Sequence, residues 1–191
     1  FERVPHRVGE LWLERHAVIE DELIKAFEVP TEAASISVAI DRASVPMEED
    51  VPRPPGRPRK NAPKRSVRRV FHMCYCATVT LHDKDGRALH TLRRGQMPGC
   101  DPQDLCNLLA NDVLVLREKR PDLLLALLAD GAPEMWNLLE ANFPTSVFGS
   151  VHRCIDFWHV VEKLAAAAKV LASNADAARA MVWAWRHQLR R

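Results

Sequence analysis

The chain has 191 residues, of which 47% are hydrophobic and 27% charged, and its formal net charge at pH 7 is +2. This balance predicts a soluble globular chain with one hydrophobic core. No apolar run approaches the roughly 20 residues that span a bilayer, and no secretory leader is visible, so a membrane-spanning class is excluded at this stage. Because the chain begins at Phe1 and ends inside a helical pattern at Arg191, we expect a segment of a longer protein.

The N-terminal part of the sequence is helical in pattern. Within residues 8–27, apolar side chains recur at helical spacing, at Val8, Leu11, Leu13, Val18, Leu23 and Ile24. We therefore expect an N-terminal helical segment over residues 1–30, ahead of the core.

A short strand and a long basic segment follow. The β-branched run SISVAID, residues 35–41, predicts a strand that ends at Asp41. Residues 45–69 are rich in proline and basic side chains, which favours an exposed, extended loop over a strand or a helix. From Arg53 to Arg69 there are eight Lys or Arg residues and no Asp or Glu, which indicates contact with a polyanion.

The rest of the chain reads as alternating strands and helices. Residues 71–94 alternate in polarity and break at Asp85-Gly86, which predicts a β-hairpin. A helix is predicted over 101–119, with Asp101 as N-cap and Pro102 at its first position. A strand buried on both faces is predicted over 123–130, followed by a short helix over 133–142 and a strand over 151–156. The last two predicted elements are a helix over 157–172 and a helix capped by Ser173 or Asn174. This order predicts a mixed α/β sheet with helices on both faces.

Two carboxylates end predicted strands. If the first and fourth strands are parallel neighbours, Asp41 and Asp130 meet at the carboxyl edge of the sheet. Two carboxylates there repel unless a cation lies between them, and their oxygens suit Mg²⁺ or Mn²⁺. Gly131 would then leave room for a metal-bound phosphate. The alternative is that each aspartate simply ends a strand at a turn.

A third polar group opens the helix over 157–172. Asp156 and His159 are three residues apart, so they lie on one helical face, and Glu162 is rotated further round. Asp156 is alternatively an N-cap, His159 a structural histidine, and Glu162 either a member of the acid site or a solvated side chain.

The five cysteines are Cys74, Cys76, Cys100, Cys106 and Cys154. An odd number without zinc spacing predicts reduced, mostly buried thiols in the cytosol. A metal site formed by His72, Cys74 and Cys76 is the weaker alternative.

Within the basic segment, RPPGRPRK (residues 53–60) is similar to an AT-hook. Proline extends the chain, and Arg57 and Arg59 would reach the minor-groove floor or phosphates. General phosphate contact is favoured over groove reading, and a charged linker is the alternative.

Five stretches together resemble a known family. They are AIDRASVPMEE, PPGRPRKNAPKR, YCATVTLHDKDGRALHTLR, LLADGAPEMWNLLE and IDFWHVVEKL. In this order, over roughly residues 35–172, they are similar to bacterial insertion-sequence transposases of the ISKra type, which are distantly similar to Mutator-like transposases. The resemblance implies an RNase H-like mixed sheet, with three antiparallel strands then two parallel ones, flanked by helices and with a helical extension at each end.

The resemblance also implies a DDE active site. Asp41 matches the first acid and Asp130 the second, and together they would hold Mg²⁺ or Mn²⁺. Asp156 and His159 match a supporting D-x-x-H element. The final glutamate of the family follows a helical insertion, so we expect it beyond Arg191, with Glu162 as the in-chain alternative. Arg42 stands where the related motif often has glycine.

These expectations define the predicted organisation and function. Residues 1–30 form the helical segment, residues 33–160 the catalytic core with its basic loop over 50–69, and residues 161–191 the start of the insertion. The implied function is cleavage and transfer of DNA strands, with transposon ends and target DNA as partners. The expected location is the bacterial cytoplasm, and a homo-oligomer is possible. The DNA-binding residues would be Arg53, Arg57, Arg59, Lys60, Lys64 and Arg65. The alternatives are a catalytically inactive DNA-binding remnant and, with less support, a small-molecule enzyme.

Overall fold

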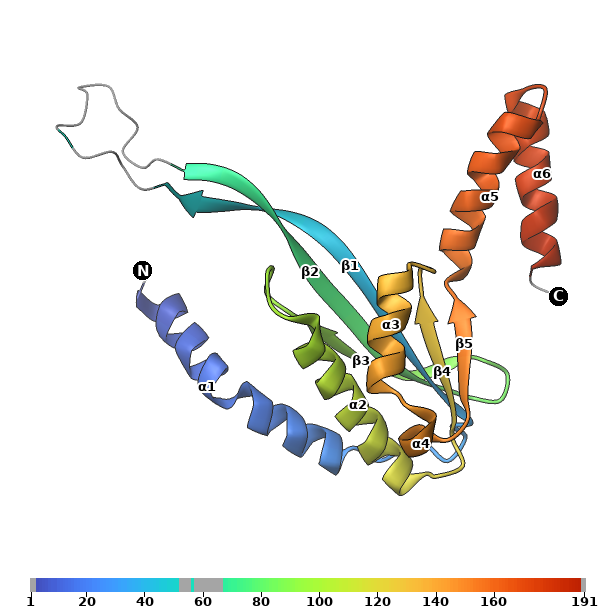
Figure 1. Cartoon of the computed structure of the whole chain (residues 1–191). Helices are drawn as coiled ribbons and strands as arrows, with labels where there is room; N and C mark the ends of the chain where they lie inside the picture. Colours follow the sequence, from blue (N-terminus) through green and yellow to red (C-terminus); the bar gives the residue numbers. More distant parts are fainter. Residues whose placement is uncertain (1–2, 52–55, 57–66, 190–191) are drawn as a thin grey trace.

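The computed structural model describes residues 3–51, residue 56 and residues 67–189. The elements, in chain order, are α1 (Arg3–Ala26), β1 (Ser35–Asp50), β2 (Val67–His82), β3 (Ala88–Gly95), α2 (Pro102–Lys119), β4 (Leu124–Ala129), α3 (Pro133–Asn142), α4 (Thr145–Phe148), β5 (Val151–Ile155), α5 (Phe157–Leu171) and α6 (Ala175–Gln188) (Figure 1). No helix in these ranges is long and apolar enough to cross a membrane.

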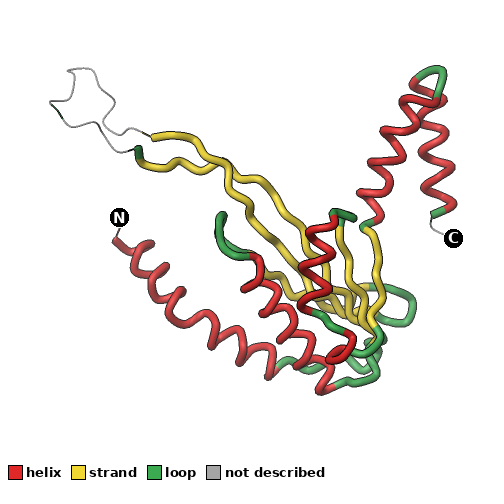
Figure 2. The backbone as a smooth tube through the Cα atoms, viewed as in Figure 1, coloured by secondary structure: helices red, strands yellow, loops and turns green. Residues whose placement is uncertain are grey.

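The strands form one five-stranded mixed sheet in the order β3-β2-β1-β4-β5. They are labelled in Figure 1 and drawn in yellow in Figure 2. β1 is antiparallel to β2 and parallel to β4, and β5 is parallel to β4. The prediction that the first and fourth strands are parallel neighbours is confirmed. The spatial order differs from the chain order expected above, because β1 lies in the middle, with the antiparallel and parallel pairs on opposite sides of it.

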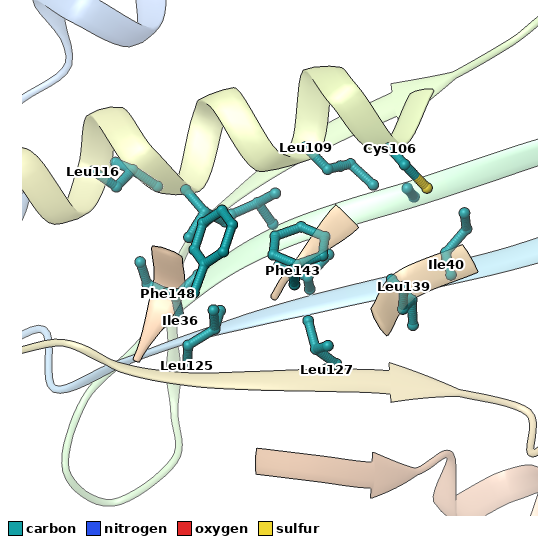
Figure 3. Close-up of a cluster of buried hydrophobic side chains, with 14 of the residues drawn as sticks. Ile36, Ile40, Cys106, Leu109, Leu116, Leu125, Leu127, Leu139, Phe143 and Phe148 are labelled. Carbon is teal, nitrogen blue, oxygen red and sulfur yellow. The ribbon is translucent and has the colours of Figure 1, made fainter. Parts of the chain in front are cut away.

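The hydrophobic core lies between one face of this sheet and the helices α2 and α3 (Figure 3). Alternation along β1 directs Ile36, Val38 and Ile40 into it, where they are at most 3% exposed. Leu125 and Leu127 of β4 join them, each 1% exposed. The facing residues of α2, spaced three to four apart, are Leu105, Leu109, Val113 and Leu116, and all are buried.

The other face of the sheet is more open than the sequence suggested. Leu124 is 58% exposed, and Ala126 and Leu128 are only partly buried. Helices α5 and α6 extend away from the sheet instead of covering this face (Figure 1). For the described residues, the predictions of helices on both faces and of a fourth strand buried on both faces are therefore wrong. A continuous leucine run carries no alternation that would mark which side chains stay exposed.

β1 and β2 continue beyond the sheet as a two-stranded ribbon, formed by residues 42–50 and 67–75 (Figure 1). β1 pairs with β4 only as far as Ala39, and β2 pairs with β3 only from Cys76 onward. The first strand, expected to end at Asp41, therefore continues to Asp50, and residues 45–50 and 67–69 of the expected loop are strand. Most of the rest of that loop lies outside the described residues. Pro46 is tolerated because β1 has no second neighbour there.

Charge pairs across the ribbon favour the strands that the sequence reading missed. Glu48 lies opposite Arg69, and Glu49 lies opposite Arg68. Arg68 Nη2 donates to Glu49 Oε2 at 3.0 Å, and His72 Nε2 lies 2.8 Å from Glu49 Oε1. Opposite charges directly across a strand pair stabilise it, and this pattern is visible only once the register is known.

Local turn and cap signals were reliable. The hairpin between β2 and β3 is confirmed: Asp83 Oδ1 accepts the N–H groups of Asp85 and Arg87, and Gly86 has a φ of 79°. Asp101 caps α2 by accepting from Gln103 N at 2.9 Å. Asn174, rather than Ser173, caps α6.

The thiols are free but not mostly buried. Cys106 is buried, where desolvation raises the pKa of its thiol to about 11. Cys76, Cys100 and Cys154 are exposed, and Cys74 is intermediate. The prediction of mostly buried thiols is thus wrong, because two of these cysteines lie on parts of β2 and β5 that no described helix covers.

A buried ion pair joins the helices to the sheet. Asp112 of α2 is 1% exposed, and its carboxylate accepts two hydrogen bonds from the Arg94 guanidinium of β3, at 3.0 and 2.8 Å. Arg94 also pairs with Glu20 of α1. Burial raises the pKa of Asp112, and Arg94 counters that effect. Lys119 adds bonds to the carbonyls of Lys25 and Phe27 at 2.6 and 2.7 Å.

We predict that Asp112→Ala lowers the free energy of unfolding by about 3 kcal/mol, because it leaves a buried guanidinium without its main partner. Urea denaturation at neutral pH measures this value. The matched control is Asp122→Ala, which removes an exposed pair with Arg120 and should lower the free energy of unfolding far less, because solvent screens the attraction between exposed charges. Equal losses in the two variants would contradict the assigned role of the buried pair.

Candidate active site

A pocket of about 380 Å³ opens where β1 separates from β4, beyond the carboxyl ends of β4 and β5. Asp41, Asp130, Asp156 and His159 all line it. Ala39 is level with Leu128 in the parallel register, so two further residues along each chain bring Asp41 level with Asp130. Both aspartates therefore line the same pocket at this edge of the sheet.

The turn after β4 fixes the direction of Asp130. Its Oδ1 accepts the N–H of Ala132 at 2.8 Å. Gly131 has a φ of 92°, a left-handed conformation that favours glycine. A Cβ at Gly131 would meet only Ile155 Cγ2, at 4.0 Å. The glycine is thus required by the backbone conformation and not by lack of space, which confirms the turn interpretation of Asp130-Gly131. Asp130 also lines the pocket.

Asp41 lies on the open face of β1. Its Oδ1 accepts the N–H of Arg42 at 2.7 Å. The Arg42 side chain projects to the other face and pairs with Glu134 at the start of α3. That hydrogen bond raises the pKa of Arg42. The residue that departs from the family pattern therefore ties β1 to α3 and does not enter the pocket.

Cys76 is the neighbour of Asp41 across β1 and β2. It lines the same pocket. Cys76 is exposed as a residue, but partial desolvation of its sulfur, followed by the neighbouring Cys74 and Asp41, raises the pKa of the thiol. The thiol is therefore neutral near pH 7, and it adds no charge to the pocket.

Asp156 joins β5 to α5 and caps the helix. Its Oδ1 accepts from Trp158 N at 2.7 Å and from His159 N at 3.0 Å. The backbone N–H of His159 is the main cause of the lowered pKa of Asp156. The Nδ1 of His159 lies 3.3 Å from the same oxygen, although this contact lacks hydrogen-bond geometry. The N-cap interpretation is confirmed, and the cap also lines the pocket.

Glu162 is placed differently. It is exposed on α5 and is not among the residues that line the pocket. Within the described ranges it forms no hydrogen bond or ion pair. The structure thus brings together Asp41, Asp130, Asp156 and His159 but does not bring Glu162 to them.

Arg93 is a pocket residue that the sequence reasoning missed. It lies opposite Thr78 in the β2-β3 pair, and both line the pocket. Arg93 is exposed, whereas its neighbour Arg94 is held by Asp112. The sequence carried no reliable signal for this position, because a register shift in the β2-β3 pair breaks the alternation counted from the turn. Arg93 can offer a cation to an anionic ligand beside the aspartates.

The carboxylate oxygens that line the pocket are ligands that hard cations prefer, but they do not enclose a cation. Among the residues that the structure describes, no group of three or more His, Cys, Asp or Glu is close enough to hold a metal ion. The His72 and Cys74 side chains are occupied elsewhere, by Glu49 and by the Gln96 carbonyl. What remains in the pocket is a set of carboxylate oxygens whose Oδ1 atoms are oriented by backbone N–H groups.

The predicted DNA contacts Arg53, Arg57, Arg59, Lys60, Lys64 and Arg65 lie outside the described residues. No protein-family model, no curated protein and no solved structure matches this chain.

Substitutions at Asp156 should distinguish the stability contributed by its helix cap from that contributed by its negative charge. Asp156→Ala should lower the free energy of unfolding by about 1 kcal/mol, whereas Asp156→Asn should keep the cap at nearly full strength. Because the pKa of Asp156 is lowered on folding, the carboxylate contributes stability above the ordinary aspartate pKa and loses it as pH falls through the lowered one.

Urea denaturation at pH 7 and near pH 3 measures both effects. The advantage of the wild type over Asp156→Asn should shrink at the lower pH. An asparagine variant as unstable as the alanine variant at pH 7 would contradict the assigned cap.

Proposed function

We propose that this chain is a catalytic-domain segment of a DDE transposase, which cleaves and joins DNA strands with a divalent cation. One observation carries the proposal: Asp41 and Asp130, from adjacent parallel strands, line one pocket. The sheet order, with antiparallel strands on one side of β1 and parallel strands on the other, is compatible with an RNase H-like fold. The five sequence stretches that resemble ISKra-type transposases supply the reaction class.

The donor set fits Mg²⁺ or Mn²⁺. Magnesium is commonly held by one or two carboxylates, with waters and substrate phosphates completing its shell. A pocket lined by Asp41, within β1, and by Asp130, after β4, in which the described residues enclose no metal ion, matches that pattern better than it matches a closed structural site. Such an ion, when bound, would supply Lewis acidity and a nucleophile at neutral pH.

The remaining pocket residues have roles that follow from their positions. The backbone N–H groups of Arg42 and Ala132 hold one oxygen of each aspartate, which fixes the orientation of the donors before any ligand arrives. Arg93 offers a positive charge for a phosphate of the DNA backbone. His159 and Asp156 border the pocket at the start of α5. The basic residues between Arg53 and Arg69 would bind DNA phosphates.

A catalytically inactive DNA-binding remnant is the second candidate. The position of Glu162 favours it, because this glutamate is exposed on α5 and away from the pocket. The two candidates differ in one measurable property, which is metal-dependent chemistry at Asp41 and Asp130.

Asp41→Asn and Asp130→Asn test the catalytic proposal. In the full-length transposase, each should reduce metal-dependent strand cleavage by about 100-fold or more, because a neutral amide cannot replace a carboxylate at the ion. In this chain, each should weaken Mn²⁺ binding by about tenfold or more, followed by electron paramagnetic resonance. DNA affinity should be retained.

The matched control is Asp122→Asn, an exposed aspartate outside the pocket. It should leave cleavage and Mn²⁺ binding unchanged. Cleavage that persists in both pocket variants would overturn the proposed site. Wild-type DNA binding without cleavage would instead support the inactive remnant.

A salt titration tests the proposed DNA contacts. Replacing Arg53, Arg57, Arg59, Lys60, Lys64 and Arg65 by glutamine should flatten the plot of log affinity against log salt, by up to about 5 units of slope if each contacts one phosphate. Gel-shift measurements at several salt concentrations give the slope. Glutamine at the exposed Lys84, Lys163 and Lys169 is the control. An unchanged slope in the first variant would remove this segment as the contact.

A further inference from the structure

Ser37 and His82 form a hydrogen-bonded pair on the open face of the sheet, outside the pocket. Ser37 lies in β1 and His82 is the last residue of β2, and Ser37 Oγ is 2.8 Å from His82 Nε2. Ser37 shares a face of β1 with Asp41, because the two are four residues apart. Neither member of the pair lines the pocket, and the proposed function gives neither of them a role.

The other ring nitrogen of His82 determines which tautomer the ring adopts. Nδ1 lies 3.3 Å from the carbonyl oxygen of Gly86, in the turn between β2 and β3. A carbonyl oxygen can only accept a hydrogen bond, so Nδ1 carries the proton in this contact. In the neutral ring Nε2 then has a free lone pair, and the Ser37 hydroxyl is the donor to it. The pair is therefore oriented for transfer of a proton from the serine to the histidine.

The backbone on either side of His82 is held in place by hydrogen bonds. The Ala34 N–H donates to the His82 carbonyl at 2.8 Å. In the turn, Asp83 Oδ1 accepts the N–H of Arg87 at 2.8 Å, and the Asp83 carbonyl accepts the N–H of Gly86 at 3.1 Å. The Gly86 carbonyl is thus fixed where it can orient the ring. A hydroxyl, a base within hydrogen-bond distance of it and a third group that orients the base are the arrangement by which enzymes activate a serine.

Ser37 is accessible and has an apolar surface beside it. In the register of β1 with β4, Ser37 is level with Ala126, and Leu124 is the preceding residue of β4 on the same face. Leu124 is 58% exposed, and Ala126, Ser37 and His82 are partly exposed. Helices α5 and α6 extend away from this face (Figure 1). A small ligand can therefore reach the hydroxyl and place an apolar group against Leu124 and Ala126.

We propose that Ser37 is a nucleophile, with His82 as its general base, in a second site that hydrolyses small carboxylic esters with an apolar acyl group. Ser37 Oγ attacks the ester carbonyl carbon while its proton passes to His82 Nε2. The bond from that carbon to the leaving oxygen then breaks, and the leaving oxygen takes the proton from Nε2. Water releases the acid by the same two steps, with Ser37 Oγ as the leaving oxygen. This chemistry uses neither Asp41 nor Asp130, so it stands independently of the proposed function.

Reaction with p-nitrophenyl acetate tests this site, because its good leaving group makes attack by an activated hydroxyl easy to follow. With a chelator present, the wild-type chain should release p-nitrophenolate and become acetylated at Ser37, which peptide mass spectrometry locates. Ser37→Ala should abolish this acetylation. His82→Gln should slow it by about 100-fold or more, because an amide cannot take up the serine proton.

The matched control is Ser35→Ala. Ser35 lies on the same face of β1, level with His82 and Leu124, but among the described residues the His82 ring is bonded to Ser37 and Gly86 instead. This variant should react as the wild type does, and circular dichroism confirms that every variant folds. A wild-type chain that is not acetylated at Ser37 would overturn the proposal. Acetylation of Ser37 that is as fast in His82→Gln, or of Ser35 that is as fast as that of Ser37, would overturn it as well.

Discussion

β1 is hydrogen-bonded to a neighbour on each edge over Ser35–Ala39, and the rest of the fold depends on this pairing. Its alternation sends Ile36, Val38 and Ile40 into the core. Burying each such side chain contributes roughly 1.5–3 kcal/mol, so together they fix the register by several kcal/mol. A slip of one residue would expose all three and turn Asp41 toward the helices. The direction of the Asp41 carboxylate is thus set by the hydrophobic residues that precede it.

The same strand explains why the pocket and the ribbon are next to each other. Past Ala39, β1 loses β4 as a partner but keeps β2. On the β4 side this separation opens the pocket, at the level where Asp130 leaves the sheet. On the β2 side the pairing continues into the ribbon, supported by Glu49, Arg68 and His72. One change in strand partners therefore produces both features.

The sequence predicted those parts of the fold that local chemistry determines. Asp85-Gly86 marked the hairpin, and Asp101-Pro102 marked the start of α2, because turn and cap geometries require those residue types. The neighbouring positions of Asp41 and Asp130 could be predicted because both follow apolar runs that suit parallel strands. The one further assumption was that the first and fourth strands are neighbours in the sheet.

The errors arose where partners distant in sequence decide the outcome. Pro46 and the nearby charges suggested a loop, since the opposite charges that stabilise the ribbon lie on β2. The leucines of β4 suggested burial on both faces, since nothing in the run reveals that helices α2 and α3 cover only one. Arg93 was missed because its position in the pocket depends on the pairing of β3 with β2, not on any motif around it.

The ribbon sets a length scale for the proposed DNA contact. β1 runs from Asp41 to Asp50, just before the basic segment, and nine residues of extended strand span at most about 30 Å. Acidic side chains along this path face basic side chains of β2. Glu48 lies opposite Arg69, and Glu49 is paired with Arg68 and His72. These paired carboxylates therefore repel the phosphates of a DNA backbone less than unpaired carboxylates would. A duplex that reaches both the pocket and the start of the basic segment would extend over about nine base pairs, at 3.4 Å per step. Strand cleavage at the aspartates and DNA binding by the basic segment would then involve different parts of one DNA site, and the length of β1 would set the distance between them.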